Sequence, residues 1–218
     1  RMLYTTTRSD GTAAVASAIV MASREARSER RPVVACTHGT TGVVPGCAPS
    51  LLEDPFANVP ALRQLIDHGW VYVATDYVGL GTSGPHPYLI GEGEARSALD
   101  SIRALRQMEG LRVGDDTVVW GHSQGGHAAL WTGIVAPNYA PDVDILGVAA
   151  IAPASDLPSL IDAIQATPVG RIMSAFVLRS YAAAYPDVEF DEYVPGWKRW
   201  LANDISGRCL AGREALFS

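Results

Sequence analysis

The stretch Thr117-Val118-Val119-Trp120-Gly121-His122-Ser123-Gln124-Gly125-Gly126 is the most informative part of the chain. It contains the pattern Gly-x-Ser-x-Gly, with Ser123 at its centre. A β-branched, apolar run precedes the pattern, and an apolar stretch with the length of a helix, residues 125–136, follows it. A strand, a sharp turn and a helix in this order are the setting in which a serine is held exposed as a nucleophile. The sequence therefore predicts a nucleophilic role for Ser123.

The two glycines of the pattern, Gly121 and Gly125, have a steric purpose. A residue at the tip of so tight a turn is held in a strained backbone conformation, and side chains two residues to either side would collide with the strand and the helix. The backbone N–H of Gln124 lies at the N-terminus of the following helix, where negative charge is favoured. We therefore expect this N–H to stabilise an oxyanion formed beside Ser123. The alternative is a glycine-rich turn with an incidental serine.

Strand-like and helix-like stretches alternate on both sides of this turn. The predicted strands are 33–37, 70–75, 117–120 and 145–151, and the predicted helices are 56–68, 92–109 and 125–136. Such alternation indicates an α/β fold, with a mostly parallel sheet and helices on both faces. The turn Ser9-Asp10-Gly11 lies between apolar stretches at 3–7 and 12–21, which predicts an antiparallel hairpin at one edge of the sheet.

From residue 155 onward the strand pattern stops. The stretches 157–165, 169–185 and 197–203 have helical character, and no further strand is evident. We therefore expect an α/β core over residues 1–154 and an incomplete helical cap, or lid, over residues 155–218. The aromatic residues of this cap either line a pocket or pack against one another; they are Phe176, Tyr181, Tyr185, Tyr193, Trp197 and Trp200.

Composition limits the classes of function. Of the 218 residues, 48% are hydrophobic and 18% are charged, which is typical of one well-packed domain with at most a small subdomain. The net charge of −6 and the lack of a basic run argue against nucleic acid as a partner. No apolar stretch reaches the roughly 18 residues needed to cross a bilayer. Neither metal-ligand spacing nor a nucleotide fingerprint occurs, so we expect no metal and no organic cofactor.

A second oxyanion donor should come from a loop that follows an earlier strand. Two loops qualify: residues 38–42, which read His-Gly-Thr-Thr-Gly, and residues 76–81, which read Asp-Tyr-Val-Gly-Leu-Gly. Sequence spacing does not choose between them. His38, Thr40 and Tyr77, which lie in these loops, are the expected substrate-binding residues. The remaining histidines are expected in structural, loop or surface positions; they are His68, His86, His122 and His127.

The three cysteines fall into two groups. Cys36 lies inside an apolar strand and is expected to be a buried free thiol. Cys47 and Cys209 lie near glycines in loop-like sequence. They either pair with each other, which would suit an exported protein, or bind a partner outside the chain.

Several motifs fit one known family. They are the 38–42 loop followed by Cys47-Ala48-Pro49-Ser50, the strand that ends in Thr75-Asp76-Tyr77-Val78-Gly79, the helix over residues 93–105, and the serine turn. With these motifs the chain resembles the secretory lipase family, which includes lipases of the fungal lipase A type and actinobacterial esterases. The resemblance implies an α/β-hydrolase fold, a secreted serine esterase or lipase that forms a covalent acyl-enzyme, and an apolar ester or lipid as substrate. It also implies that Asp76 and Gln124 build the oxyanion hole.

The expected chemistry needs a general base. In α/β-hydrolases the chain order is serine, acid, histidine, whereas no histidine follows His127. We therefore expect the acid, the histidine and the last strands of the sheet from beyond residue 218, on a companion polypeptide or in the rest of a longer chain. The alternatives are a non-catalytic relative that keeps the turn as part of a binding protein, and a serine peptidase or acyltransferase on the same scaffold.

Overall fold

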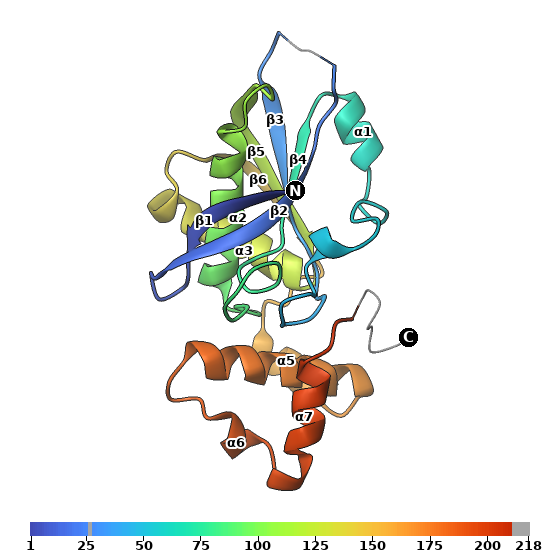
Figure 1. The fold of residues 1–218 in the computed structure, drawn as a ribbon, viewed down its shortest axis with the longest axis vertical. Helices are drawn as coiled ribbons and strands as arrows, with labels where there is room; N and C mark the ends of the chain where they lie inside the picture. The colour runs from blue at the N-terminus through green and yellow to red at the C-terminus, as the bar shows by residue number, and fades with distance from the viewer. Residues whose placement is uncertain (26–27, 211–218) are drawn as a thin grey trace.

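The computed structural model describes residues 1–25 and 28–210 (Figure 1). Within these residues, six strands form one sheet in the order β1-β2-β4-β3-β5-β6. The strands are β1 (Met2–Thr7), β2 (Ala13–Met21), β3 (Arg31–Thr37), β4 (Val71–Thr75), β5 (Val113–His122) and β6 (Asp144–Ile151). Strands β4, β3, β5 and β6 run parallel, whereas β1 and β2 form an antiparallel hairpin that joins the sheet through β4. The predicted parallel sheet with an antiparallel edge is confirmed.

Helices cover both faces of this sheet, as expected. Side chains alternate between the two faces of a strand, so neighbours on β3 enter different cores. Val33 packs with residues of α2 (Gly91–Arg106) and α3 (Gln124–Tyr139) on one face. Val34 packs on the other face, against α1 (Leu62–Asp67). The sheet is therefore the middle layer of a three-layer core.

The first predicted helix is shorter than its apolar spacing indicated. It was expected over residues 56–68, but α1 begins at Leu62. Val59 precedes Pro60, and a residue before proline is disfavoured in the α conformation. Ala61 then adopts a left-handed conformation with a φ of 52°. The chain therefore turns through residues 56–61 before it becomes helical.

The helices that follow β6 form a separate layer, the cap (Figure 1). They are α4 (Leu157–Ile164), α5 (Pro168–Ala184), α6 (Phe190–Tyr193) and α7 (Arg199–Ser206), together with the 3-10 turn η2 (Gly196–Lys198). A further 3-10 turn, η1 (Pro49–Leu51), lies in the core. Sequence periodicity had not predicted the single turn α6. Residues 211–218 of the expected cap lie outside the described residues. None of the helices described here combines the length and the apolarity that a membrane span requires.

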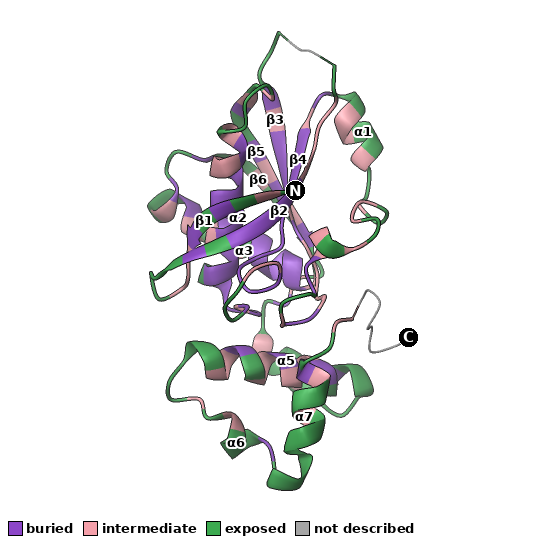
Figure 2. Cartoon of the chain, viewed as in Figure 1, coloured by how far each residue is buried: buried purple, intermediate pink, exposed green. Residues whose placement is uncertain are grey.

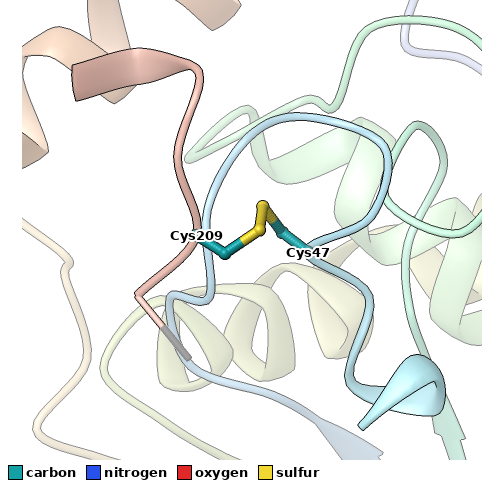
Figure 3. The surroundings of a disulfide bond; sticks show 2 residues. All are labelled: Cys47 and Cys209. Carbon is teal, nitrogen blue, oxygen red and sulfur yellow. A yellow bond between two sulfur atoms is a disulfide. The ribbon is translucent and has the colours of Figure 1, made fainter. Parts of the chain in front are cut away.

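A disulfide joins the end of the cap to the core (Figure 3). Cys47 lies in the loop after β3 and Cys209 directly follows the last turn of the cap, 162 residues away. The backbone N–H of Leu210 also donates to the carbonyl oxygen of Thr41 at 2.7 Å. Of the two alternatives that the sequence left open, the structure has Cys47 paired with Cys209. Cys36 is a free thiol, but it is half-buried rather than fully buried.

Candidate active site

Ser123 occupies the turn between β5 and α3. Its φ of 58° and ψ of −121° lie in a region that residues with a side chain rarely adopt. The surrounding hydrogen bonds hold this conformation, because Ser123 N–H donates to the carbonyl of Ile151 at 3.0 Å and its own carbonyl accepts from His127 N–H at 3.1 Å. The strand–turn–helix arrangement expected from the sequence is therefore present.

The glycines on either side are required by close backbone approaches. A Cβ at Gly121 would overlap the carbonyl oxygen of Gly125, and a Cβ at Gly125 would overlap the carbonyl oxygen of Thr37 at the end of β3. The Thr37 hydroxyl contacts both sides of the turn, since it lies 2.9 Å from the Trp120 carbonyl oxygen and 2.8 Å from the Gly125 carbonyl oxygen. The turn is thus packed directly on the end of the neighbouring strand.

Ser123 opens into a cavity of about 1260 Å³ between the core and the cap. The core side of the cavity includes the 38–41 loop and Gln124, and the cap side consists mainly of aliphatic residues. The cap residues that line it are Leu157, Pro158, Leu160, Ile161, Asp162, Ile164, Val169, Met173, Val177 and Tyr181. Tyr181 is the one cap aromatic among them. Phe176 is fully buried in the contact between cap and core, while Tyr193, Trp197 and Trp200 are exposed.

The 38–42 loop lies against the nucleophile turn. A Cβ at Gly39 would come within 3.3 Å of the His122 carbonyl oxygen, and His38 and Thr40 both line the cavity. Nδ1 of His38 is 2.7 Å from the Gly39 carbonyl oxygen, and burial lowers the pKa of this histidine. The Thr40 hydroxyl is 3.0 Å from that of Tyr88. The structure therefore brings two of the three expected substrate-binding residues to Ser123.

Asp76 and Tyr77, from the second loop, do not line this cavity. The backbone N–H of Asp76 donates to the Ser17 carbonyl at 2.7 Å, and its carboxylate accepts from the Ser17 hydroxyl and, at 2.8 Å, from Ser50 N–H. Tyr77 is fully buried, and its ring lies 4.5 Å from that of His38. Asp76 thus fixes the loop after β3 against β2, and its N–H is not free to serve as an oxyanion donor.

Behind the turn lies a buried polar cluster that sequence reasoning missed. The side-chain amide of Gln124 donates to Glu94 Oε1 at 2.7 Å and approaches His86 Nε2 at 3.0 Å. Glu94 is fully buried, and so is His86, which had been expected at a surface or loop position. One signal was present: Glu94 shares the buried stripe of α2 with Ala98, because the two are one helical turn apart.

No described histidine is hydrogen-bonded to the Ser123 hydroxyl. Ring nitrogens of His86 and His127 contact the carbonyl oxygens of Val78 and Ala154, and His68 contacts that of Gln64. His122 is exposed. The described part of the chain thus holds a candidate nucleophile and a candidate oxyanion donor, but no histidine base that is hydrogen-bonded to the Ser123 hydroxyl.

The chain matches known lipases in sequence over much of its length. The family model described as "Secretory lipase" matches residues 57–213. Lipase 7 of Candida albicans is 30% identical over 152 residues, which cover 68% of this chain and 34% of that protein. A secreted triacylglycerol lipase of Malassezia globosa is 31% identical over 154 residues, which cover 66% of this chain and 32% of that protein. The chain therefore spans about a third of the length of these relatives.

Solved structures share the fold. Candida antarctica lipase A in its closed state superposes with a TM-score of 0.77 at 22% identity, over 95% of this chain and 50% of that one. A rice cell wall degrading esterase from Xanthomonas oryzae superposes with a TM-score of 0.74 at 22% identity, over 94% of this chain and 56% of that one. The sheet, the nucleophile turn and the family match together identify an α/β-hydrolase chain that belongs to the secretory lipase family.

Proposed function

We propose that the intact protein hydrolyses carboxylic esters of apolar acyl groups through a covalent acyl-enzyme on Ser123. One observation carries the proposal: a serine at positive φ, in a turn that two glycines make possible, opens into an apolar cavity. A backbone held in this conformation keeps the hydroxyl at the tip of the turn, where an ester carbonyl can reach it. The family membership points to the same chemistry.

In the proposed first step, the Ser123 oxygen attacks the ester carbonyl while its proton passes to a general base. The alcohol then leaves with a proton returned by that base, and water hydrolyses the acyl-enzyme by the same route. The tetrahedral intermediate carries its negative charge on the former carbonyl oxygen. The backbone N–H of Gln124, the first residue of α3, has no acceptor within its helix and is the proposed first oxyanion donor.

For the second donor we favour the 38–42 loop over Asp76. This loop lines the cavity and lies against the nucleophile turn, whereas the Asp76 N–H is already bonded to Ser17. Backbone N–H groups of a loop are suitable donors because they are held rigidly and need no reorganisation during the reaction. Each oxyanion donor removed typically lowers the rate about 10²–10³-fold.

The base and the acid that orients it are proposed to come from outside residues 1–218. A serine hydrolase needs a histidine within hydrogen-bond reach of its nucleophile. The described histidines are bonded elsewhere or exposed, and the relatives are about three times longer than the matched region. Whether these groups belong to the same polypeptide or to a companion chain is decided by the intact mass of the active protein.

The substrate is proposed to be an acylglycerol or another apolar ester. The cap presents aliphatic side chains to the cavity, which suits an acyl chain and offers few partners for a polar one. The relative from Malassezia globosa is described as a secreted triacylglycerol lipase. We also propose that the protein is exported, since the Cys47–Cys209 disulfide suits an oxidising compartment.

A fluorophosphonate probe tests the nucleophile directly. The intact protein should form a covalent adduct that mass spectrometry locates on Ser123, and the Ser123→Ala variant should remain unlabelled. An intact protein that carries a histidine base but gives no adduct would exclude the hydrolase mechanism and favour a binding protein.

Turnover separates the competing enzyme classes. Nitrophenyl esters of increasing acyl length should be hydrolysed, and the corresponding anilides should not. Hydrolysis of the anilides at comparable rates would favour a peptidase. Transfer of the acyl group to an added alcohol in preference to water would favour an acyltransferase.

A further inference from the structure

The buried cluster behind the nucleophile turn contains a carboxyl group without a role in the proposed reaction. Glu94 lies on α2 with no exposed surface. Its Oε1 accepts from the Gln124 side chain at 2.7 Å and from Leu89 N–H at 3.2 Å. Its Oε2 has no hydrogen-bond partner, and the nearest complementary atom is Nε2 of His127, at 3.9 Å.

The histidine contacts define which groups in this cluster carry hydrogen. Nδ1 of His86 faces the Val78 carbonyl oxygen at 3.2 Å, and Nδ1 of His127 faces the Ala154 carbonyl oxygen at 2.8 Å. A carbonyl oxygen only accepts, so each Nδ1 carries the proton and each Nε2 of a neutral ring is an acceptor. The acceptor of His86 faces the Gln124 amide, which fixes that amide with its nitrogen toward His86 and Glu94.

The acceptor of His127 faces Glu94 Oε2, so a proton on Oε2 gives these two atoms complementary roles. Burial raises the pKa of Glu94 to about 8 and lowers that of His86 to about 3, and burial also lowers the pKa of His127. Three tyrosines interact electrostatically with Glu94, and they stay neutral because burial raises their pKa values too; they are Tyr77, Tyr88 and Tyr181. The whole cluster is therefore uncharged at neutral pH.

We propose that Glu94 is a positioning residue: as a buried neutral carboxylic acid it holds the Gln124 side chain, and through it the backbone N–H that faces the oxyanion. The inference rests on the proposed function of Gln124. Because Gln124 is the first residue of α3, its backbone lacks the intrahelical bond that fixes N–H groups further along a helix. The anchored side chain, bonded to Glu94 and approached by His86, supplies that constraint instead.

This arrangement makes the oxyanion hole sensitive to alkaline pH. Loss of the Glu94 proton places a negative charge next to the side chain of the donor residue, inside a buried region where charges interact strongly. It also leaves two acceptors, Glu94 Oε2 and His127 Nε2, facing each other. The first effect opposes the negative charge that develops on the substrate, and the second disturbs the contacts of the residue that anchors Gln124. We therefore expect kcat to fall as pH rises through the pKa of Glu94, with little change in KM.

The test compares the pH profiles of Glu94→Gln, Glu94→Leu and the control Glu92→Gln, each in the intact protein. A glutamine at position 94 keeps the acceptor for Gln124, supplies donors for the unpaired atoms and cannot ionise. Glu94→Gln should retain kcat at pH 7 and lose the alkaline fall. Glu94→Leu leaves the Gln124 amide unpaired and should lower kcat by about 10–100-fold, which is the range expected for a misplaced catalytic group. Glu92 is exposed on the same helix, so its variant should match the wild type.

A second readout does not depend on turnover. Labelling with ¹⁵N-glutamine restricts the backbone signals to glutamines, of which residues 1–218 contain Gln64, Gln107, Gln124 and Gln165. The Gln124 amide resonance should titrate with a midpoint near pH 8 in the wild type and in Glu92→Gln, and should not titrate in Glu94→Gln.

The outcomes separate the two proposals. An alkaline fall and a Gln124 titration that persist unchanged in Glu94→Gln would overturn the role of Glu94. A titration that is lost in Glu94→Gln, in a protein whose turnover equals that of Ser123→Ala, would support the coupling of Glu94 to Gln124 and reject the proposed hydrolase function.

Discussion

The core and the cap of this protein are stabilised in different ways (Figure 2). In the core, β4 is buried along its whole length and most of α2 is buried as well. In the cap, no residue of α4 or α6 is buried, and Ser206 is the buried residue of α7. The core is thus a packed interior in its own right, whereas the cap depends on the surface beneath it.

The contacts that hold the cap lie around the candidate active site. Phe176 of α5 is fully buried against Tyr88 and Leu89, which follow β4 in the chain. The Tyr181 hydroxyl donates to the Leu89 carbonyl at 3.2 Å, and the disulfide fixes the end of the cap at Cys47. The cap is therefore attached at the rim of the cavity that contains Ser123, so a change in its attachment is also a change in the proposed substrate cavity.

The largest effect is expected from a substitution in the core, at Gly125 in the turn that contains Ser123. A Gly125→Ala substitution places a Cβ on the Thr37 carbonyl, a backbone group that cannot move without shifting β3. We expect a loss above about 4 kcal/mol in the free energy of unfolding, the range in which buried steric conflicts lie, together with loss of fluorophosphonate labelling. Gly196→Ala in the cap is the matched control, since a Cβ there meets no atom within 4 Å. Urea denaturation measures the free energy of unfolding of both variants. Equal values for Gly125→Ala and Gly196→Ala would contradict the prediction.

The next largest effect is expected from removal of Phe176, the side chain that anchors the cap to the core. Phe176→Ala should lower the free energy of unfolding by about 3–5 kcal/mol, as expected for a large aromatic removed from a packed site. Trp197→Ala is the control because this side chain is 73% exposed, and its effect should stay within about 0.5 kcal/mol. Limited proteolysis should cut the cap of Phe176→Ala before the core. Simultaneous digestion of both regions would show that they unfold as one unit.

A smaller effect follows from removal of the disulfide. The double substitution Cys47→Ser and Cys209→Ser opens a loop of 162 residues and should lower stability by about 2–4 kcal/mol. Because Cys47 follows the 38–42 loop, the variant should also lose esterase activity while the core remains folded. Circular dichroism and ester turnover, each measured with and without a reducing agent, report the two consequences. Full activity of the reduced wild type would show that the candidate active site does not depend on the disulfide.

The smallest effect is a pH dependence confined to the core. Glu94 has a folded-state pKa of about 8, above its ordinary value of 4.5, so the folded state binds this proton more tightly than the unfolded state does. Its stabilising contribution is complete below about pH 4.5 and is lost as pH rises to about 8. His86, with a pKa lowered to about 3, acts in the opposite direction, but only below its ordinary value of 6.5.

Between pH 6.5 and 8 the term from Glu94 therefore dominates. The free energy of unfolding should fall by about 2 kcal/mol over this interval, at about 1.4 kcal/mol per pH unit for one proton. Glu94→Gln should not show this decrease, and Glu92→Gln should show it in full. Chemical denaturation at pH 6.5, 7.2 and 8 measures the slopes. Parallel slopes for the wild type and Glu94→Gln would mean that the carboxyl is already ionised in this interval.

The sequence by itself determined the parts of the protein that depend on neighbouring residues. Periodicity gave the alternation of strands and helices, and the spacing of Gly121, Ser123 and Gly125 predicted the turn that the structure contains. These features are local because a strand or a helix repeats over a few residues and a tight turn restricts the residues within it. Local prediction failed where Pro60 delayed the start of α1, and it missed the single turn α6.

Only the tertiary structure decided which polar groups are free to act. The carbonyl of Ser17 accepts from the N–H of Asp76 from 59 positions away, whereas the 38–42 loop lies beside Ser123, and this difference supports the proposed choice of oxyanion donor. Glu94 meets Gln124 across 30 positions and is a buried acid, a pairing that its neighbours in the sequence do not specify. Hydrogen bonds and burial depend on where distant segments pack. The composition and periodicity of a chain determine its elements, but the partner of each polar group is determined only when those elements meet.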